Sequence, residues 1–372
     1  MSKIEDLIQQ YCPEGVEYVK LGDVCSVLRG KRLTKSQLKQ DGKCKVFHGG
    51  TEPIGFYDEY NREGDTTMII NVGASAGTVG YSVDDFWSSD GCFCLSHTPI
   101  MLGRYIYFYL KTVELFLMSR VRRAGIPTLD GKVLEQLEIP LPPLPVQQEI
   151  VRILDTFTEL QAELQAELQA RQLQYQYYRD QLLAFEGRKD VEWKKLGDIG
   201  NNLDRLRKPI TANKREIGDI PYYGASGIVD YVKGFIFDGD YLLVSEDGAN
   251  LLTRTYPIAF SIKGKTWVNN HAHVIEFKET ATRKYVEHYL NSIDLSSWIS
   301  AGAQPKLTKD GLNRLPIPLP SIEEQQRIVS ILDRFDTLVN DLSQGLPAEI
   351  EARRQQYEYY RDKLLTFKRK EA

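Results

Sequence analysis

The chain has 372 residues, of which 42% are hydrophobic and 26% are charged, and its formal net charge is −4. This length allows two or three domains with cores of their own, and the composition is that of a soluble globular protein. No apolar run is long enough to span a membrane, and residues 1–6 lack the pattern of a signal peptide, so we expect a cytoplasmic protein. All five cysteines lie in the first half and are expected to be reduced thiols, because Cys92 and Cys94 have the wrong spacing for a zinc site.

The first globular region is expected over residues 16–140, where short strand-like runs alternate with Gly, Asn and Asp turns. Residues 67–72 have the apolar pattern of a buried strand, and a glycine-containing loop with Ser75 follows them. A short helix is expected over residues 105–118. The region is therefore predicted to be a mixed α/β globule.

A long helix is expected from Pro145 to Phe185, with a length of about 60 Å at 1.5 Å per residue. A Leu-Gln-Ala-Glu tetrapeptide repeats in tandem over residues 160–167 and in part over 168–170. Each copy would lengthen the helix by about 6 Å, although plain helical filler is an alternative interpretation. The apolar side chains recur at three- and four-residue steps, as in a coiled coil: Ile150, Leu154, Phe157, Leu160, Leu164 and Leu168.

The second globular region has the same plan. Residues 241–245 predict a buried strand, the loop 246–250 follows it, and a helix is expected over residues 285–293. His271 and His273 lie on one face of a strand, and they are expected to be structural or DNA-contacting residues instead of metal ligands.

A second long helix begins near Ser321, which forms a capping box with Glu324, and Gly345-Leu346-Pro347 is expected to break or kink it. Since both long helices have one apolar face, the two are expected to pack on each other in antiparallel fashion. Two-fold pseudosymmetry would then place the globules at opposite ends. The second apolar stripe consists of Ile328, Leu332, Phe335, Leu338 and Leu342.

The framework of the chain occurs twice, whereas the globular inserts between its parts differ. Such a repeat predicts one scaffold that presents two unlike surfaces. The matched segments are residues 16–23 and 191–198, residues 140–157 and 318–335, and residues 175–185 and 357–367.

A basic run follows the matched Leu-Gly-Asp segment in each half. A solvated face is the plainer interpretation of one such run, but the matched placement of two favours DNA contact. Arginine can bridge guanine O6 and N7, and lysine more often holds phosphate. The candidate DNA-binding residues are Arg29, Lys31, Arg32, Ser75, Arg205, Arg207, Lys208, Asn250, Lys306 and Lys309.

The ordered set of motifs resembles the specificity subunits of type I restriction-modification systems over essentially the whole chain. Each motif is weak alone, but the set occurs twice in the same order. The motifs are the Leu-Gly-Asp starts, Ala124-Gly125-x-Pro127-x-Leu129 and Ala301-Gly302-x-x-Pro305-x-Leu307, the Pro-Leu-Pro to Gln-Gln to Ile-Leu-Asp boundaries, the Tyr-Tyr-Arg-Asp-x-Leu-Leu helix ends and the tetrapeptide repeat.

This resemblance implies an α+β fold with two target-recognition domains in a pseudo-two-fold arrangement, separated by two long antiparallel helices that form a coiled coil. The expected domains are 1–140 and 189–317 for recognition, and 141–188 and 318–372 for the spacer helices. Each recognition domain would bind one half of a bipartite, asymmetric sequence in double-stranded DNA. Two methyltransferase subunits would dock on the helices, with restriction/motor subunits in the full assembly. Partner-docking candidates are Tyr177, Arg179, Tyr359 and Arg361.

The sequence predicts no catalytic residue, metal ligand or cofactor in this chain. The only Pro-Pro pair, Pro142-Pro143, lies between leucines, unlike the loop with which amino-methyltransferases hold an extruded base. Gly264-Lys265-Thr266 lacks the upstream glycine of a phosphate-binding loop. The resemblance instead implies that S-adenosylmethionine, ATP and Mg²⁺ belong to partner subunits. A solitary methyltransferase or nuclease, and a coiled-coil adaptor for two proteins, remain alternatives at this point.

Overall fold

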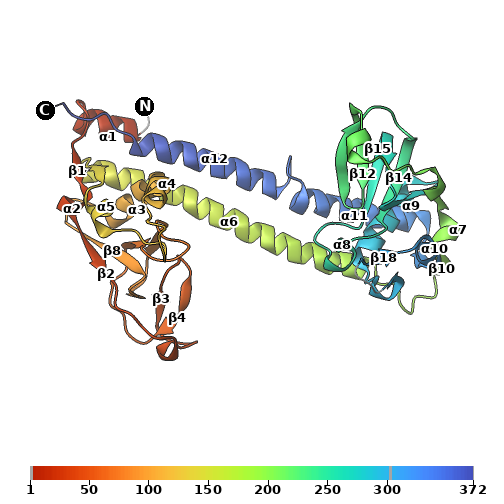
Figure 1. The fold of residues 1–372 in the computed structure, drawn as a ribbon, viewed down its shortest axis with the longest axis horizontal. Helices are drawn as coiled ribbons and strands as arrows, with labels where there is room; N and C mark the ends of the chain where they lie inside the picture. The colour runs from red at the N-terminus through yellow and green to blue at the C-terminus, as the bar shows by residue number, and fades with distance from the viewer. Residues whose placement is uncertain (1–2, 301–303, 372) are drawn as a thin grey trace. The chain divides into compact units, whose positions relative to one another are not determined.

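Figure 1 shows the fold in a computed structural model, which describes residues 3–300 and 304–371. The chain divides into two compact units. Unit 1 comprises Met1–Gln165 and Glu349–Ala372, and unit 2 comprises Ala166–Ala348. None of the helices in the described part of the chain has an apolar stretch long enough to cross a bilayer.

Unit 1 combines short strands with short helices and with parts of two long helices. Its strands are β1 (Tyr18–Lys20), β2 (Cys25–Arg29), β3 (Cys44–Phe47), β4 (Pro53–Tyr57), β5 (Thr66–Ile70), β6 (Val79–Ser82), β7 (Phe86–Ser88), β8 (Cys92–His97) and β9 (Glu138–Pro140). Its helices are α1 (Lys3–Tyr11), α2 (Leu21–Val24), α3 (Gly103–Thr112), α4 (Glu114–Ser119), α5 (Gly131–Glu135), the first part of α6 (Leu144–Leu182) and most of α12 (Leu346–Leu365).

Unit 2 has longer strands. They are β10 (Glu192–Lys195), β11 (Asn201–Asn202), β12 (Ile217–Gly224), β13 (Gly227–Val232), β14 (Phe237–Ser245), β15 (Ala259–Val268), β16 (Ala272–Glu276), β17 (Ile299–Ser300), β18 (Lys306–Leu307) and β19 (Pro316–Leu319). Its helices are α7 (Leu196–Ile199), α8 (Asn250–Thr253), α9 (Thr280–Ser292), α10 (Lys309–Arg314), α11 (Ile322–Asn340) and the last part of α6.

The main sheets of the two units share a strand order. In unit 1 the order is β2-β8-β5-β6, and in unit 2 it begins β11-β16-β14-β15. The neighbouring strands in both series are antiparallel. A hairpin, β3-β4 in unit 1 and β12-β13 in unit 2, adds a parallel pairing of β3 with β7 and of β12 with β15. The halves therefore share a topology that their divergent inserts conceal.

The predicted elements are found with one change. β5 and β14 confirm the two buried strands, and α9 contains the helix predicted over 285–293. The helix predicted over 105–118 is two helices, because α3 ends at Thr112 and α4 begins at Glu114. The carboxylate of Glu114 accepts from the backbone N–H of Val79 at 2.7 Å and from Lys111, so it holds this corner to strand β6.

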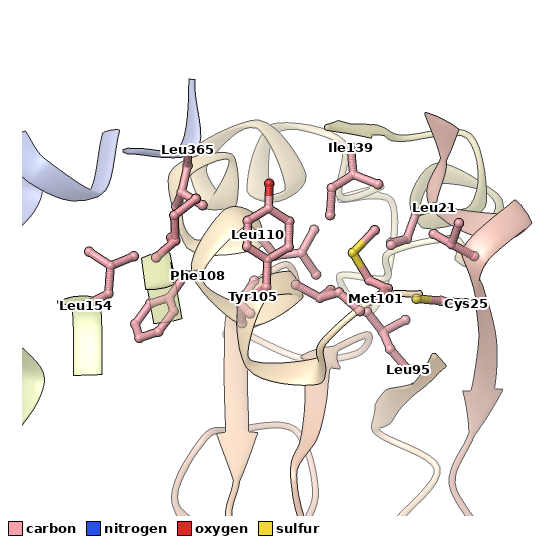
Figure 2. Close-up of a cluster of buried hydrophobic side chains, with 14 of the residues drawn as sticks. Leu21, Cys25, Leu95, Met101, Tyr105, Phe108, Leu110, Ile139, Leu154 and Leu365 are labelled. Atoms are coloured by element: carbon pink, nitrogen blue, oxygen red, sulfur yellow. The ribbon is translucent and has the colours of Figure 1, made fainter. Parts of the chain in front are cut away.

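Each unit has its own apolar core between sheet and long helices. Figure 2 shows Leu154 of α6 and Leu365 of α12 beside Phe108 of α3, within the cluster that also buries Tyr105. In unit 2, Tyr285 of α9 lies in the matching cluster with residues of α6 and α11. Burying this apolar surface is the main favourable contribution to folding, at about 25 cal/mol per Å².

The proline-rich segment of unit 1 is held by side-chain hydrogen bonds. Proline has no backbone N–H, so this segment cannot join a full strand ladder and its buried carbonyls need other donors. The Tyr105 hydroxyl donates to the Pro140 carbonyl at 3.2 Å, and the Gln147 amide donates to the Pro142 carbonyl at 2.7 Å. Gln147 also accepts from the backbone N–H of Leu102 and donates to the Ile100 carbonyl, both at 2.9 Å.

Unit 2 repeats this arrangement. The Tyr285 hydroxyl donates to the Pro318 carbonyl at 2.7 Å, and the Gln325 amide donates to the Pro320 carbonyl at 2.8 Å. Gln325 accepts from the Thr282 hydroxyl at 2.8 Å. The recurrence of Pro-Leu-Pro with a glutamine near the start of the long helix thus has a physical cause, because the amide satisfies carbonyls that the prolines leave unpaired.

An ion pair adds a second connection between each long helix and its unit. Arg104 of α3 binds Asp155 of α6 at 2.7 Å, and His288 of α9 binds Asp333 of α11 at 2.7 Å. The two aspartates are the matched residues of the repeated Ile-Leu-Asp motif. Each aspartate therefore faces a different cation in the two units.

The long helices pack in antiparallel pairs within the units. In unit 1, Phe157 of α6 stacks on Tyr360 of α12 with ring centroids 5.6 Å apart. In unit 2, Tyr178 of α6 stacks on Phe335 of α11, also at 5.6 Å. The partner's residue number falls as α6 proceeds, as antiparallel packing requires. These helices and the two sheet regions confirm the α+β class.

The predicted break in the second helix is confirmed between α11 and α12. The Asp341 carboxylate accepts from the backbone N–H groups of Ser343 and Gln344, so the chain leaves the helix there. A Cβ added at Gly345 would lie 2.4 Å from the Thr337 carbonyl, which requires glycine at this position.

We expect Gln147→Ala to lower the free energy of unfolding of unit 1 by roughly 3 kcal/mol, because it leaves buried backbone groups without partners. Gln148→Ala, one residue further along on the exposed side, is the matched control and should stay within about 0.5 kcal/mol of the parent protein. Urea and thermal unfolding of both variants measure this. Equal destabilisation by the two changes would contradict the role given to Gln147.

Candidate nucleic-acid interface

Basic loop 1 (residues 29–32) follows β2 and lies against the turn that precedes β8. The backbone N–H of Lys31 donates to the Ser88 carbonyl at 2.9 Å, and the indole N–H of Trp87 donates to the Lys31 carbonyl at 2.7 Å. A Cβ added at Gly30 would lie 2.1 Å from the Ser89 carbonyl, so the loop approaches this turn more closely than other residues allow. The loop backbone is thereby fixed while its cations remain outside.

Basic loop 2 (residues 205–208) is held in the same way in unit 2. The backbone N–H of Lys208 donates to the Val268 carbonyl at 3.4 Å, and the indole N–H of Trp267 donates to the Lys208 carbonyl at 2.6 Å. The tryptophans occupy matched places, since Val46 pairs with Trp87 and Tyr222 with Trp267 in the two parallel pairings. The sequence analysis missed both tryptophans, although each precedes a matched strand by five residues.

The predicted cations differ in how free they are. In basic loop 1 the residues Arg29, Lys31 and Arg32 are all exposed, and the Arg29 Nε–H lies 3.4 Å from the Asp90 carbonyl. In basic loop 2 the residues Arg205 and Lys208 are exposed. Each loop therefore presents positive charge to solvent from a fixed backbone.

Arg207 differs from its neighbours in basic loop 2. Its side chain is only 12% exposed, and it binds the Glu246 carboxylate at 2.5 Å and the Ala272 carbonyl at 2.8 Å. Asp204 lies 3.4 Å away. The guanidinium is therefore occupied inside the protein, where it ties basic loop 2 to the loop after β14.

A buried charge network surrounds Arg207. Nδ1 of His273 binds Asp204 at 2.6 Å and Nε2 binds the Leu307 carbonyl at 2.8 Å, so both ring nitrogens donate to acceptors. Lys306 binds Glu246 at 2.9 Å. Among the described residues, Asp204, Glu246 and His273 form the one group with metal-ligand spacing, but Arg207 and Lys306 already balance its two carboxylates.

The surrounding charges shift the pKa of both carboxyls. Burial alone would raise the pKa of Asp204, but the hydrogen bond with His273 and nearby positive charge outweigh burial and lower it. Burial would likewise raise the pKa of Glu246, but hydrogen bonds from Lys306 and Arg207 lower it. Both groups are thus stabilised as carboxylates by the loops they connect.

The repeated Pro-x-Leu segments brace the loops that follow β5 and β14. In unit 1 the Gly73 N–H donates to the Pro127 carbonyl at 2.9 Å, and in unit 2 the Gly248 N–H donates to the Pro305 carbonyl at 3.1 Å. Leu129 and Leu307 donate to the residue at the start of each loop. Ala301 and Gly302 of the second motif lie outside the described residues.

The two predicted loop residues are placed differently. Ser75 is half-buried in the loop after β5, and its carbonyl accepts from the Thr78 N–H. The Asn250 amide accepts from the Tyr256 N–H at 2.9 Å and donates to the Tyr256 carbonyl at 3.0 Å. The Asn250 side chain therefore shapes its own loop.

The two predicted lysines near α10 lie in different surroundings. Lys306 joins the charge network, whereas Lys309 lines a separate groove of about 690 Å³ with Asn201 and Glu276. Unit 2 thus brings Lys306 to the loops around Arg207, and Lys309 lies by the far end of β16.

The predicted partner-docking residues form the same local arrangement twice. Tyr177 and Tyr359 are 61% and 62% exposed, and each makes an edge contact with the tyrosine that follows it. Arg179 lies 6.0 Å from the Tyr175 ring, and Arg361 lies 5.7 Å from the Tyr357 ring. Two exposed tyrosines on rigid helices are thereby held in matched settings.

Cys92 and Cys94 lie in an apolar cluster with Phe47 and Phe86. Burial raises the pKa of the Cys92 thiol to about 12, which disfavours the thiolate that a metal would need.

Comparison with known proteins gives consistent matches. The family described as type I restriction modification DNA specificity domain matches residues 13–171 and 188–352. The chain is 36% identical over 301 residues to the EcoR124I/EcoR124II specificity subunit of Escherichia coli, covering 73% of this chain and 72% of that protein. It is 40% identical over 180 residues to a Haemophilus influenzae protein named as a type I restriction enzyme specificity subunit, covering 47% of this chain but only 46% of that relative.

A solved structure shares the fold. The crystal structure of a type I restriction-modification S subunit from M. genitalium has a TM-score of 0.69 and 18% identity, and the match covers 94% of this chain and 96% of that one.

The charge network predicts an acid-sensitive unit 2. A carboxyl whose pKa is lowered by folding stabilises the protein above its unfolded pKa, and this stabilisation is lost as the pH falls through the folded value. Glu246→Gln should therefore cost about 1–3 kcal/mol at neutral pH and make the loss of stability between about pH 5 and about pH 3 shallower. Glu216→Gln, on a side chain that is 78% exposed, is the control. Thermal melts across this pH range test the idea, and parallel curves for the parent and Glu246→Gln proteins would refute it.

Proposed function

The chain belongs to the family of type I restriction-modification DNA specificity subunits, and from this we propose that its two units each read one half of a bipartite, asymmetric DNA sequence. The observation that supports this most directly is the matched support of basic loops 1 and 2. Each loop is held by a tryptophan and a backbone hydrogen bond, while the side chains around it differ between the units. A common support with different side chains suits the reading of two different half-sites.

The exposed cations of the basic loops would hold and read the DNA. We assign base or phosphate contacts to Arg29, Lys31, Arg32, Arg205 and Lys208, with Ser75, Asn250, Lys306 and Lys309 as further candidates. Arg207 has a different role in this proposal, because its guanidinium positions basic loop 2 from inside the protein. The recognition domains would be 1–140 and 189–317, with spacer helices over 141–188 and 318–372.

A specificity subunit is the non-catalytic member of its complex, so methyl transfer and cleavage fall to partners. We propose that two methyltransferase subunits dock on the long helices, with contacts to Tyr177 and Arg179 on one side and to Tyr359 and Arg361 on the other. The repeated arrangement of these residues supports two equivalent docking sites. Restriction/motor subunits would complete the assembly, and S-adenosylmethionine, ATP and Mg²⁺ would be bound by the partners.

Changing one basic loop should impair recognition of one half-site. In the complex with methyltransferase subunits, Arg205→Ala with Lys208→Ala should weaken binding to the second half-site by about 1–3 kcal/mol per base contact and lower the salt slope by about 1 per phosphate contact. Arg29→Ala with Lys31→Ala should act on the other half-site. DNA binding at several salt concentrations and methylation mapping measure both effects.

Lys233→Ala is the control for the basic-loop variants, because this lysine is 76% exposed and lies after β13, away from basic loop 2 in the chain. Unchanged affinity and salt dependence in both basic-loop variants would exclude these residues from the interface.

We also propose that the long helices set the spacing between half-sites. Because α6 runs without a break through the tetrapeptide repeat, deleting Leu164 to Glu167 shortens it by about 6 Å, or about two base pairs. The methylated sequence should then show a gap one or two base pairs shorter. An unchanged gap in an active deletion variant would refute the spacer role.

A further inference from the structure

A polar groove of about 670 Å³ opens beside basic loop 2 in unit 2. Four loops line it: residues 209–211, 224–226, 247–250 and 269–271. The first of these continues directly from Lys208. The exposed residues Asn270 and His271 lie on its wall, so a ligand in the groove would meet nitrogen and oxygen atoms.

The imidazole of His271 is held by a carboxylate. Its Nδ1 lies 2.9 and 3.0 Å from the two oxygens of Asp247. The His271 side chain is 47% exposed, whereas that of Asp247 is only 14% exposed. The His271 backbone N–H also donates to the Asn269 side chain at 2.8 Å, which fixes the turn.

Asp247 is itself fixed by the framework of unit 2. Its backbone forms a bridge with Lys306, and the next residue, Gly248, donates to the Pro305 carbonyl. The imidazole therefore cannot turn away from the groove without losing both of its hydrogen bonds to Asp247.

The hydrogen bond to Asp247 determines what the ring offers to a ligand. A carboxylate can only accept, so Nδ1 carries the proton and the neutral ring has its lone pair on Nε2. Nε2 of His271 has no partner within the described part of the chain. By contrast, both ring nitrogens of the buried His273 are engaged.

We propose that His271 is a specificity-determining residue that accepts a hydrogen bond from a base in the second half-site. This inference rests on the proposed function. In the major groove only adenine N6 and cytosine N4 present donors, whereas guanine and thymine present acceptors at the matching edge. His271 therefore selects an amino-bearing base at one position, while Lys208 beside it holds the backbone.

The test uses the complex of this chain with its methyltransferase subunits. His271→Ala should reduce discrimination at one position of the second half-site by about tenfold and leave the other positions unchanged. His271→Lys replaces the acceptor with a donor, so the preference there should shift from adenine or cytosine towards guanine or thymine. Methylation mapping and competition binding with duplexes substituted at each position measure this.

His48→Ala is the matched control, because His48 is an exposed histidine beside Asp90 in unit 1. It should leave the second half-site unchanged. If the parent complex reads two half-sites but both His271 variants keep its base preferences, the inference fails and the proposed function stands. Equal weakening at every position would also overturn it, because that indicates phosphate contact. A parent complex that reads no bipartite site would overturn both.

Discussion

The buried glutamine near the start of each long helix is the interaction on which the architecture of both units depends. Prolines end each globular region because they cannot continue a strand ladder, but this leaves buried carbonyls without donors. Gln147 and Gln325 donate to these carbonyls from inside the helix. The helix direction is therefore coupled to the end of the sheet region, which couples any movement of one to the other.

On this shared framework the two units differ in their interiors. His273 pairs with Val244 in unit 2, and Phe93 pairs with Ile69 at the matching place in unit 1. A charged network therefore braces the loops of unit 2, whereas unit 1 has an aromatic side chain there. The same backbone supports can thus carry loops of different shape and charge, which is what two unlike half-sites require.

Sequence reasoning was most accurate where the signal was periodic or repeated. The buried strands β5 and β14, the long helices and the break near Gly345 were all predictable, because apolar spacing and helix-breaking residues act locally. The split between α3 and α4 was not, since it depends on the contact of Glu114 with Val79 from another strand. The distribution of cations was partly predictable, because exposure follows from charge for Arg205 but not for Arg207, which has acidic partners distant in sequence.

The sequence alone determined the twofold repeat, the α+β class and the family, because these depend on the order of residues along the chain. The tertiary structure alone decided which side chains are free to meet a ligand. Arg207 and Asn250 are engaged within the protein, Trp87 and Trp267 hold the basic loops, and His271 faces a groove. These roles arise from hydrogen bonds and ion pairs between residues far apart in the chain, and only folding brings such partners together.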